Sequence, residues 1–142
     1  AAWYDANYYK IVGEKMHLDK DLLCKGNKVY SPTTCVYVPH MLNTILLNKS
    51  NFRGSLPVGV EKNFNKYIAK LNKRTPEGVI SREYLGMFKT PDEAFQAYKK
   101  EKEAYIKAEA DRYKAMMTKE RDVKIFAKVY NALYAYEVHE KD

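Results

Sequence analysis

Positively charged side chains are concentrated in the middle of the chain. Residues 51–90 carry eight basic and three acidic side chains (net +5), residues 1–50 carry six and four (+2), and residues 91–142 carry eleven of each (0). Clustered positive charge attracts a polyanion over about a Debye length, roughly 10 Å at moderate salt. Nucleic acid is therefore the first candidate partner, an anionic membrane surface is the second, and a merely solvated basic surface is the third alternative.

Alternating apolar and polar residues in this region predict a small antiparallel sheet. The expected strands are Val58–Glu61, Lys66–Leu71 and Val79–Phe88, and the expected turns are Asn63–Asn65 and Arg74–Gly78. A basic sheet of this kind would hold the cations in a fixed array.

A helix start signal follows the third expected strand. Thr90 is placed as an N-cap, Pro91 as the first helical residue and Glu93 as the third, which together form a capping box. The sequence therefore predicts a helix that begins directly after the sheet.

The C-terminal part of the chain has a helical pattern over residues 92–117 and again over residues 119–138. Thr118 could cap the second helix, or the two stretches could form one long rod. One side of the second stretch is apolar, and its members are Ile125, Phe126, Val129, Tyr130, Leu133 and Tyr136. The alternating charges on the other side indicate a solvated surface.

The N-terminal part reads as a short helix, a hairpin and a second helix. The spacing of apolar residues predicts a helix over Trp3–Ile11, extended segments over Lys15–Leu23 and Cys35–Val38, and a helix that begins at Pro39. Residues 48–55 have the polar composition of a linker, so we expect a module boundary there.

The composition is that of a globular protein of one ordinary domain or two small ones. The chain has 142 residues, of which 46% are hydrophobic and 30% are charged. Cys24 and Cys35 have no C-x-x-C spacing and are expected to be reduced. The sequence has no signal peptide and no run long enough to span a bilayer, so an intracellular location is expected.

Two stretches of the chain resemble parts of known DNA-acting proteins. The stretch HLDKDLL…GNKVYSPTTCVYVPHMLN resembles the degenerate HNH module of phage-encoded homing-type endonucleases. The stretch GVEKNFNKYIAKLN…YLGMFKTPDEAFQAY resembles the plant ethylene-response-factor type of DNA-binding domain that is often fused to it. Together the two resemblances cover about residues 3–113.

The second resemblance implies a three-stranded sheet that enters the major groove, with a helix packed behind it. Long cationic side chains neutralise phosphates, and Arg or Asn can make bidentate contacts with base edges. The implied DNA-binding residues on the outer side of the sheet are Arg53, Lys62, Asn65, Lys66, Lys70, Asn72, Arg74 and Arg82.

The first resemblance implies a divalent metal site, for Mg²⁺ or Mn²⁺, on a hairpin and helix. By position, Asp19 matches the metal-binding Asp of the family and Asn43 matches the ligand on the helix. His40 lies three residues before Asn43, on the same helix face, and is a further candidate ligand. In the family the metal stabilises the charge on the phosphate, and a His next to the Asp activates water.

The chain departs from that pattern at the general base. Lys20 stands next to Asp19 where a His is usual, and a protonated Lys can bind a phosphate or protonate a leaving group but is a poor base at neutral pH. His17 is two residues before Asp19, so on a strand it shares a face with that carboxylate and could replace the missing base.

The resulting expectation is an α+β protein that binds double-stranded DNA. Residues 1–50 would form a ββα-metal-like module, residues 51–117 the ethylene-response-factor-like domain and residues 118–142 a C-terminal helix. Metal-dependent nicking or cleavage is the expected further activity, in the host cytoplasm if the chain is phage-encoded, and no membrane partner is expected. The alternatives are a non-enzymatic DNA-binding regulator or architectural factor on an inactivated HNH scaffold, and a protein-interaction module that self-associates through its C-terminal helices.

Overall fold

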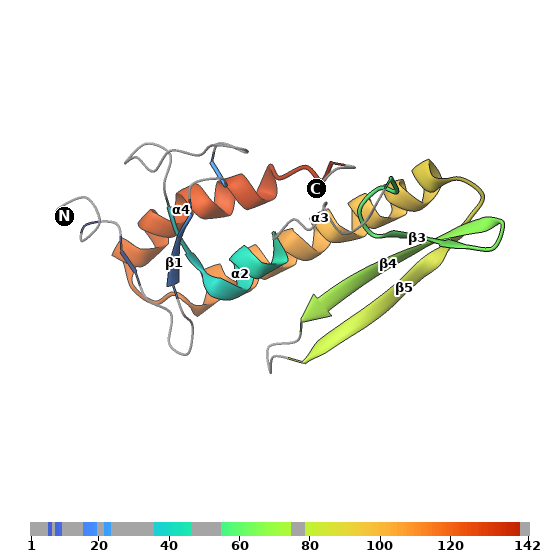
Figure 1. Cartoon of the computed structure of the whole chain (residues 1–142). Coiled ribbons are helices and arrows are strands. Elements are labelled where there is room, and N and C mark those ends of the chain that lie inside the picture. The colour runs from blue at the N-terminus through green and yellow to red at the C-terminus, as the bar shows by residue number, and fades with distance from the viewer. Residues whose placement is uncertain are drawn as a thin grey trace. The chain divides into compact units, whose positions relative to one another are not determined.

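The computed structural model describes residues 6, 8–9, 16–19, 22–23, 36–46, 55–74 and 79–139. The fold is α+β, with a three-stranded antiparallel sheet and two long helices. In chain order the elements are β1 (Met16–Asp19), β2 (Val36–Pro39), α2 (His40–Ile45), β3 (Val60–Asn63), β4 (Lys66–Arg74), β5 (Ile80–Phe88), α3 (Pro91–Met116) and α4 (Glu120–Tyr134) (Figure 1).

The chain forms two compact units. The first contains residues 1–47 and 106–136, and the second contains residues 48–105 and 137–142. Helix α3 contributes its C-terminal part to the first unit and its N-terminal part to the second. The C-terminal helix α4 therefore belongs with the N-terminal segment.

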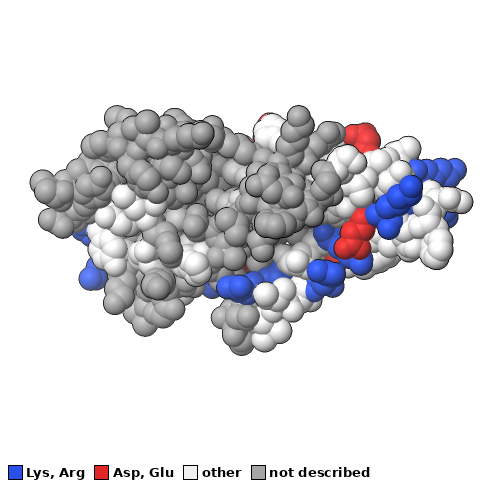
Figure 2. All heavy atoms as spheres, in the orientation of Figure 1, with Lys and Arg blue, Asp and Glu red and all other residues white. Residues whose placement is uncertain are grey.

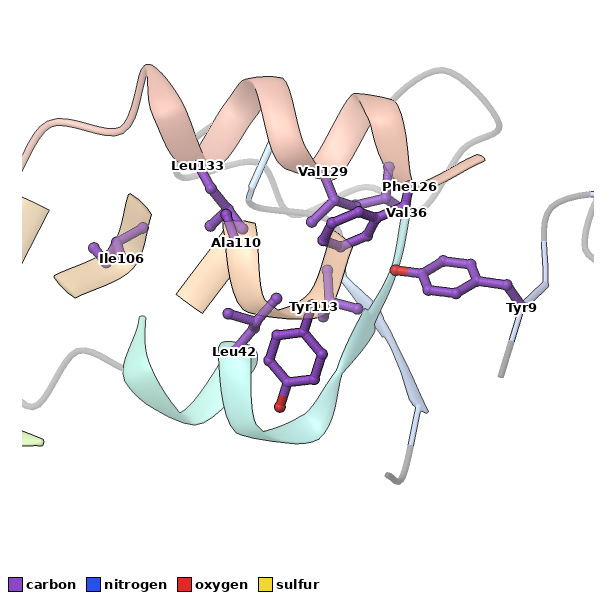
Figure 3. Packing of buried hydrophobic residues seen from close by; sticks show 10 residues of the cluster. Tyr9, Val36, Leu42, Ile106, Ala110, Tyr113, Phe126, Val129 and Leu133 are labelled. Carbon is purple, nitrogen blue, oxygen red and sulfur yellow. The ribbon is translucent and has the colours of Figure 1, made fainter. Parts of the chain in front are cut away.

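The first unit is built around a buried apolar cluster. Leu42 of α2, Ile106, Ala110 and Tyr113 of α3, and Phe126, Val129 and Leu133 of α4 meet Tyr9, Val36 and Val38 in one core (Figure 3). The contributions of α3 and α4 recur every three or four residues, which places them on one face of each helix. The apolar side of α4 is therefore buried within the chain itself, and self-association through it stays a prediction.

A carboxylate links α3 to α4 outside this core. Asp111 accepts hydrogen bonds from the hydroxyl groups of Tyr130 (2.7 Å) and Tyr134. The two helices are separate, because α3 ends at Met116 and α4 begins at Glu120. Thr118 is not the cap, because Lys119 occupies the N-cap position with an extended backbone and no side-chain cap hydrogen bond.

The first unit also contains a two-stranded antiparallel sheet. Asp19 of β1 pairs with Val36 of β2, and His17 pairs with Val38. Pro39 ends β2 and α2 begins one residue later than expected, at His40. The described residues do not show this part of the chain to be a ββα-metal module. The expected helix over residues 3–11 and linker over residues 48–55 fall largely outside them.

The second unit contains the predicted three-stranded sheet, in the order β3-β4-β5. The first strand starts two residues later than expected. Gly59 has a left-handed backbone (φ +76°) and is the last residue of a turn, so the strand begins at Val60. Phe64 and Asn65 form the tight turn between β3 and β4. The predicted start of α3 is confirmed, since the backbone N–H of Glu93 donates to Thr90 Oγ1 at 3.2 Å and Pro91 is the first helical residue.

Two tyrosines of α3 fill the layer between helix and sheet. The ring of Tyr98 lies over Gly59, so close that a Cβ at residue 59 would be 2.1 Å from Tyr98 Cδ2. About two turns further along α3, the Tyr105 hydroxyl accepts a hydrogen bond from the backbone N–H of Arg74 at 2.9 Å. Ala69 and Leu71 are buried on the strand side of this layer. One face of the sheet is thereby covered by α3 (Figure 1).

Substitution of Gly59 by Ala tests this packing. We expect Gly59→Ala to lower the free energy of unfolding by about 2–4 kcal/mol, since it adds left-handed strain and a clash with a buried ring. Denaturant unfolding measures the change. In a Tyr98→Ala background the same substitution should be less destabilising, and an unchanged effect would contradict the contact between Gly59 and Tyr98.

Candidate nucleic-acid interface

The face of the sheet opposite α3 collects most of the predicted DNA-binding residues. Side chains alternate between the two faces of a strand, and Ala69 and Leu71 point toward α3, so the neighbouring positions of β4 point away from it. The pairing register extends this assignment to β3 and β5. We call the result the outer face; its members are Glu61, Asn63, Lys66, Ile68, Lys70, Asn72, Arg74, Ile80, Arg82, Tyr84 and Met87.

An irregularity in β5 decides which of its side chains belong to the outer face. Ala69 pairs with Gly86 and the next residue, Lys70, pairs with Tyr84, so Leu85 is an extra residue without a partner on β4. Such a bulge shifts the alternation of the strand that carries it. Without it, Leu85 would be opposite Lys70. With it, Tyr84 and Arg82 face the same way as Lys70 and Asn72.

Arg82 is held in place by Asn72, the residue directly opposite. Its Nε–H donates to Asn72 Oδ1 at 3.2 Å. Within the described part of the chain, neither terminal amino group of Arg82 has a hydrogen-bond partner. Arg82 is exposed, so the contact restrains the guanidinium plane and leaves the terminal amino groups available for bidentate contacts with guanine or phosphate.

Glu61 brings a negative charge onto the same face. Its Oε2 accepts a hydrogen bond from Lys70 Nζ at 2.9 Å. This hydrogen bond lowers the pKa of Glu61, slight burial opposes the change, and the charges of Lys70 and Arg82 lower the pKa further. The carboxylate thus stays ionised and offsets one cation of the outer face.

A hollow of about 650 Å³ lies against these side chains. It is lined by Leu56, Gly59, Val60, Glu61, Lys62, Lys70, Asn72 and Arg82. Beside it, large apolar side chains are exposed on β5: Ile80 is 62% exposed, Tyr84 57% and Met87 44%. Figure 2 shows Lys and Arg gathered over the region of the sheet and the adjoining part of α3, with acidic side chains among them. The surface combines cations, an amide and an aromatic ring.

The predicted DNA-binding residues are distributed as follows. Lys66, Lys70, Asn72, Arg74 and Arg82 share the outer face. Lys62 pairs with Tyr67 and so has the opposite orientation on the edge strand β3, although it is exposed. Asn65 lies in the turn, and Arg53 lies outside the described residues. Sequence reasoning missed Glu61 and Tyr84, since the first carries the wrong charge and the second depends on the bulge.

Most of the predicted metal site lies outside the described residues. The backbones of His17, Asp19 and Asn43 lie in β1 and α2, but their side chains, and all of Lys20, fall outside what the structure describes. His40 is exposed at the start of α2. The described residues contain no group of three or more His, Cys, Asp or Glu side chains that could hold a metal ion. A divalent-metal site at these residues therefore stays a prediction.

Comparisons with protein-family models, with curated proteins and with solved structures find no significant match. Among the described helices, none has the length and apolar character needed to cross a membrane.

The hydrogen bond between Glu61 and Lys70 can be tested through the pKa of the Glu61 carboxyl group. We expect the Glu61 carboxyl carbon, followed by NMR, to titrate below the usual Glu pKa and to return toward it in Lys70→Met. Because the folded pKa is lowered, the pair contributes stability above the ordinary Glu pKa and loses it as the pH falls through the folded value. The effect of Lys70→Met on stability should therefore disappear in acid. An ordinary midpoint in the unmodified protein would contradict the pair.

Proposed function

We propose that this protein binds double-stranded DNA through the outer face of its β3-β4-β5 sheet. The observation that carries the proposal is Arg82, an exposed residue that Asn72 anchors through Nε, so that its two terminal amino groups are available for other contacts. Arginine presented in this way suits bidentate hydrogen bonding, and a neighbouring Asn can accept from or donate to adenine. A sheet or two-stranded ribbon is a known means of reading the major groove.

The remaining outer-face residues supply the parts of an interface that do not read sequence. Lys66 and Arg74 lie at opposite ends of β4, so their charges would meet phosphates spaced along the duplex. Tyr84 lies opposite Lys70 and next to Arg82 on the same face of β5, where its exposed ring offers an apolar contact to bases or sugars. The outer face would thus provide both the phosphate contacts that position the duplex and the contacts to its bases.

A protein-interaction module is the alternative from a different class. Long helices can offer an extended surface to a partner protein, which favours this alternative. However, the apolar residues of α4 that would make such a contact are buried in the chain's own core: Phe126, Val129 and Leu133. The exposed apolar and cationic side chains of the second unit favour the sheet as the binding surface instead.

The salt dependence of binding tests the proposed surface. We expect affinity for duplex DNA to fall steeply with salt, because phosphate neutralisation releases counterions. Lys66→Ala should reduce the slope of log K against log [salt] by about 1, the change expected for one lost phosphate contact. Fluorescence anisotropy of a labelled duplex measures both quantities.

Lys128→Ala is the matched control, because it removes the same side chain and the same charge from an exposed position of α4. It should leave the slope unchanged. Equal effects of the two substitutions would mean that net charge, rather than the outer face, drives binding. Absence of duplex binding at low salt would overturn the proposed function.

Metal-dependent cleavage is a separate proposal that rests on the sequence resemblance and on the position of Asp19 at the end of β1. We expect incubation with supercoiled plasmid to yield nicked or linear DNA only when Mg²⁺ or Mn²⁺ is present, and Asp19→Ala to abolish this conversion. Gel electrophoresis of the plasmid forms is the readout.

Unchanged nicking by Asp19→Ala would assign the cleavage to a contaminant or to another site. Binding without nicking in any metal would favour the non-enzymatic DNA-binding alternative.

A further inference from the structure

Phe64 is the most exposed large apolar side chain among the described residues. It is 91% exposed at the tip of the turn that joins β3 to β4. Its backbone is left-handed (φ 54°), and within the described part of the chain it is the only residue other than glycine with positive φ. Asn or Gly adopts this conformation more readily than an aromatic residue. Both the solvent exposure and the backbone conformation are unfavourable for Phe, and folding explains neither.

Two lysines flank this ring on opposite faces of the hairpin. Lys66 belongs to the outer face, opposite Asn63, whereas Lys62 pairs with Tyr67 and points to the other side. Both lysines are exposed. A hairpin tip that enters a groove of the duplex has a phosphate strand on each side. This arrangement of one cation per face and an apolar tip between them matches such a groove.

We propose that Phe64 is a wedge that inserts between adjacent base pairs of the bound duplex, while Lys62 and Lys66 contact the phosphates of the two strands. The inference rests on the proposed function and adds a deforming contact to it. Apolar side chains that enter a base step unstack it and kink the duplex by roughly 20–90°. The outer face would hold the duplex, and the wedge would bend it at the end of the sheet.

The polar neighbours of Phe64 favour a nucleic acid over a membrane. Phe64 is flanked in sequence by Asn63 and Asn65, whose amides can hydrogen-bond to base edges in either groove. A membrane-inserting tip gains by burying several apolar residues, and here a single ring stands among polar and charged side chains. The geometry therefore points to a duplex as the binding partner of this hairpin tip. Binding to a lipid surface instead is an outcome that the test below can detect.

Substitution at residue 64 separates the wedge from folding. Phe64→Asn and Phe64→Gly replace the ring with residues that suit the left-handed backbone, so both variants should keep or slightly raise the melting temperature. We expect both to weaken duplex binding by about tenfold, the order found when one aromatic stack on a base is removed. Val79→Asn is the control, since it removes a 62% exposed apolar side chain at the other end of the sheet.

Two readouts on the full chain follow the deformation directly. Energy transfer between dyes at the ends of a short duplex reports bending, and emission of 2-aminopurine within the duplex reports unstacking. The unmodified protein and Val79→Asn should increase both signals, whereas Phe64→Asn should increase neither at saturating protein.

The outcomes distinguish the two proposals. Duplex binding with equal bending by the unmodified protein and Phe64→Asn would overturn the wedge and leave the outer face as the binding surface. No duplex binding by any variant would overturn both. Phe64→Trp, whose emission should change on binding duplex DNA, would overturn the wedge if it responded only to phosphatidylserine vesicles.

Discussion

The register between β4 and β5 is the constraint on which the candidate interface depends. Because Leu85 is an extra residue in β5, Arg82 and Tyr84 face the same way as Lys70 and Asn72 rather than toward α3. A shift of β5 by one residue would move Arg82 and Tyr84 to the other face of the sheet, away from Lys70 and Asn72. The hydrogen bond from Arg82 to Asn72, and the position of Arg82 and Tyr84 beside the cations of β4, therefore follow from one backbone feature.

The opposite face of the same sheet fixes that register against α3. Tyr98 requires the absence of a side chain at Gly59, and Tyr105 holds the backbone of Arg74 at the far end of β4. Burial of Ala69 and Leu71 between these rings makes a slipped pairing costly, since it would expose apolar side chains and bury charged ones. Packing on one face thus keeps the polar residues of the other face in a constant arrangement.

Local signals in the sequence predicted the elements better than the site. The start of α3 follows from Thr90 and Pro91 alone, and the strands follow from alternation, so their positions agree with the structure to within a few residues. The bulge at Leu85 and the pairing of Glu61 with Lys70 depend on contacts between strands, which no local pattern encodes. Neither of the two alternatives at Thr118 holds, since α3 ends at Met116 and Lys119 occupies the N-cap position of α4.

In the proposed function, one face of the sheet, and not the helices, contacts duplex DNA. Backbone and side-chain NMR of the labelled protein, titrated with a short duplex at low salt, tests it most directly. We predict the largest shift changes at Lys66, Lys70, Asn72, Arg82 and Tyr84, with small changes along α4. Changes confined to α4, or none at saturating duplex, would contradict the claim.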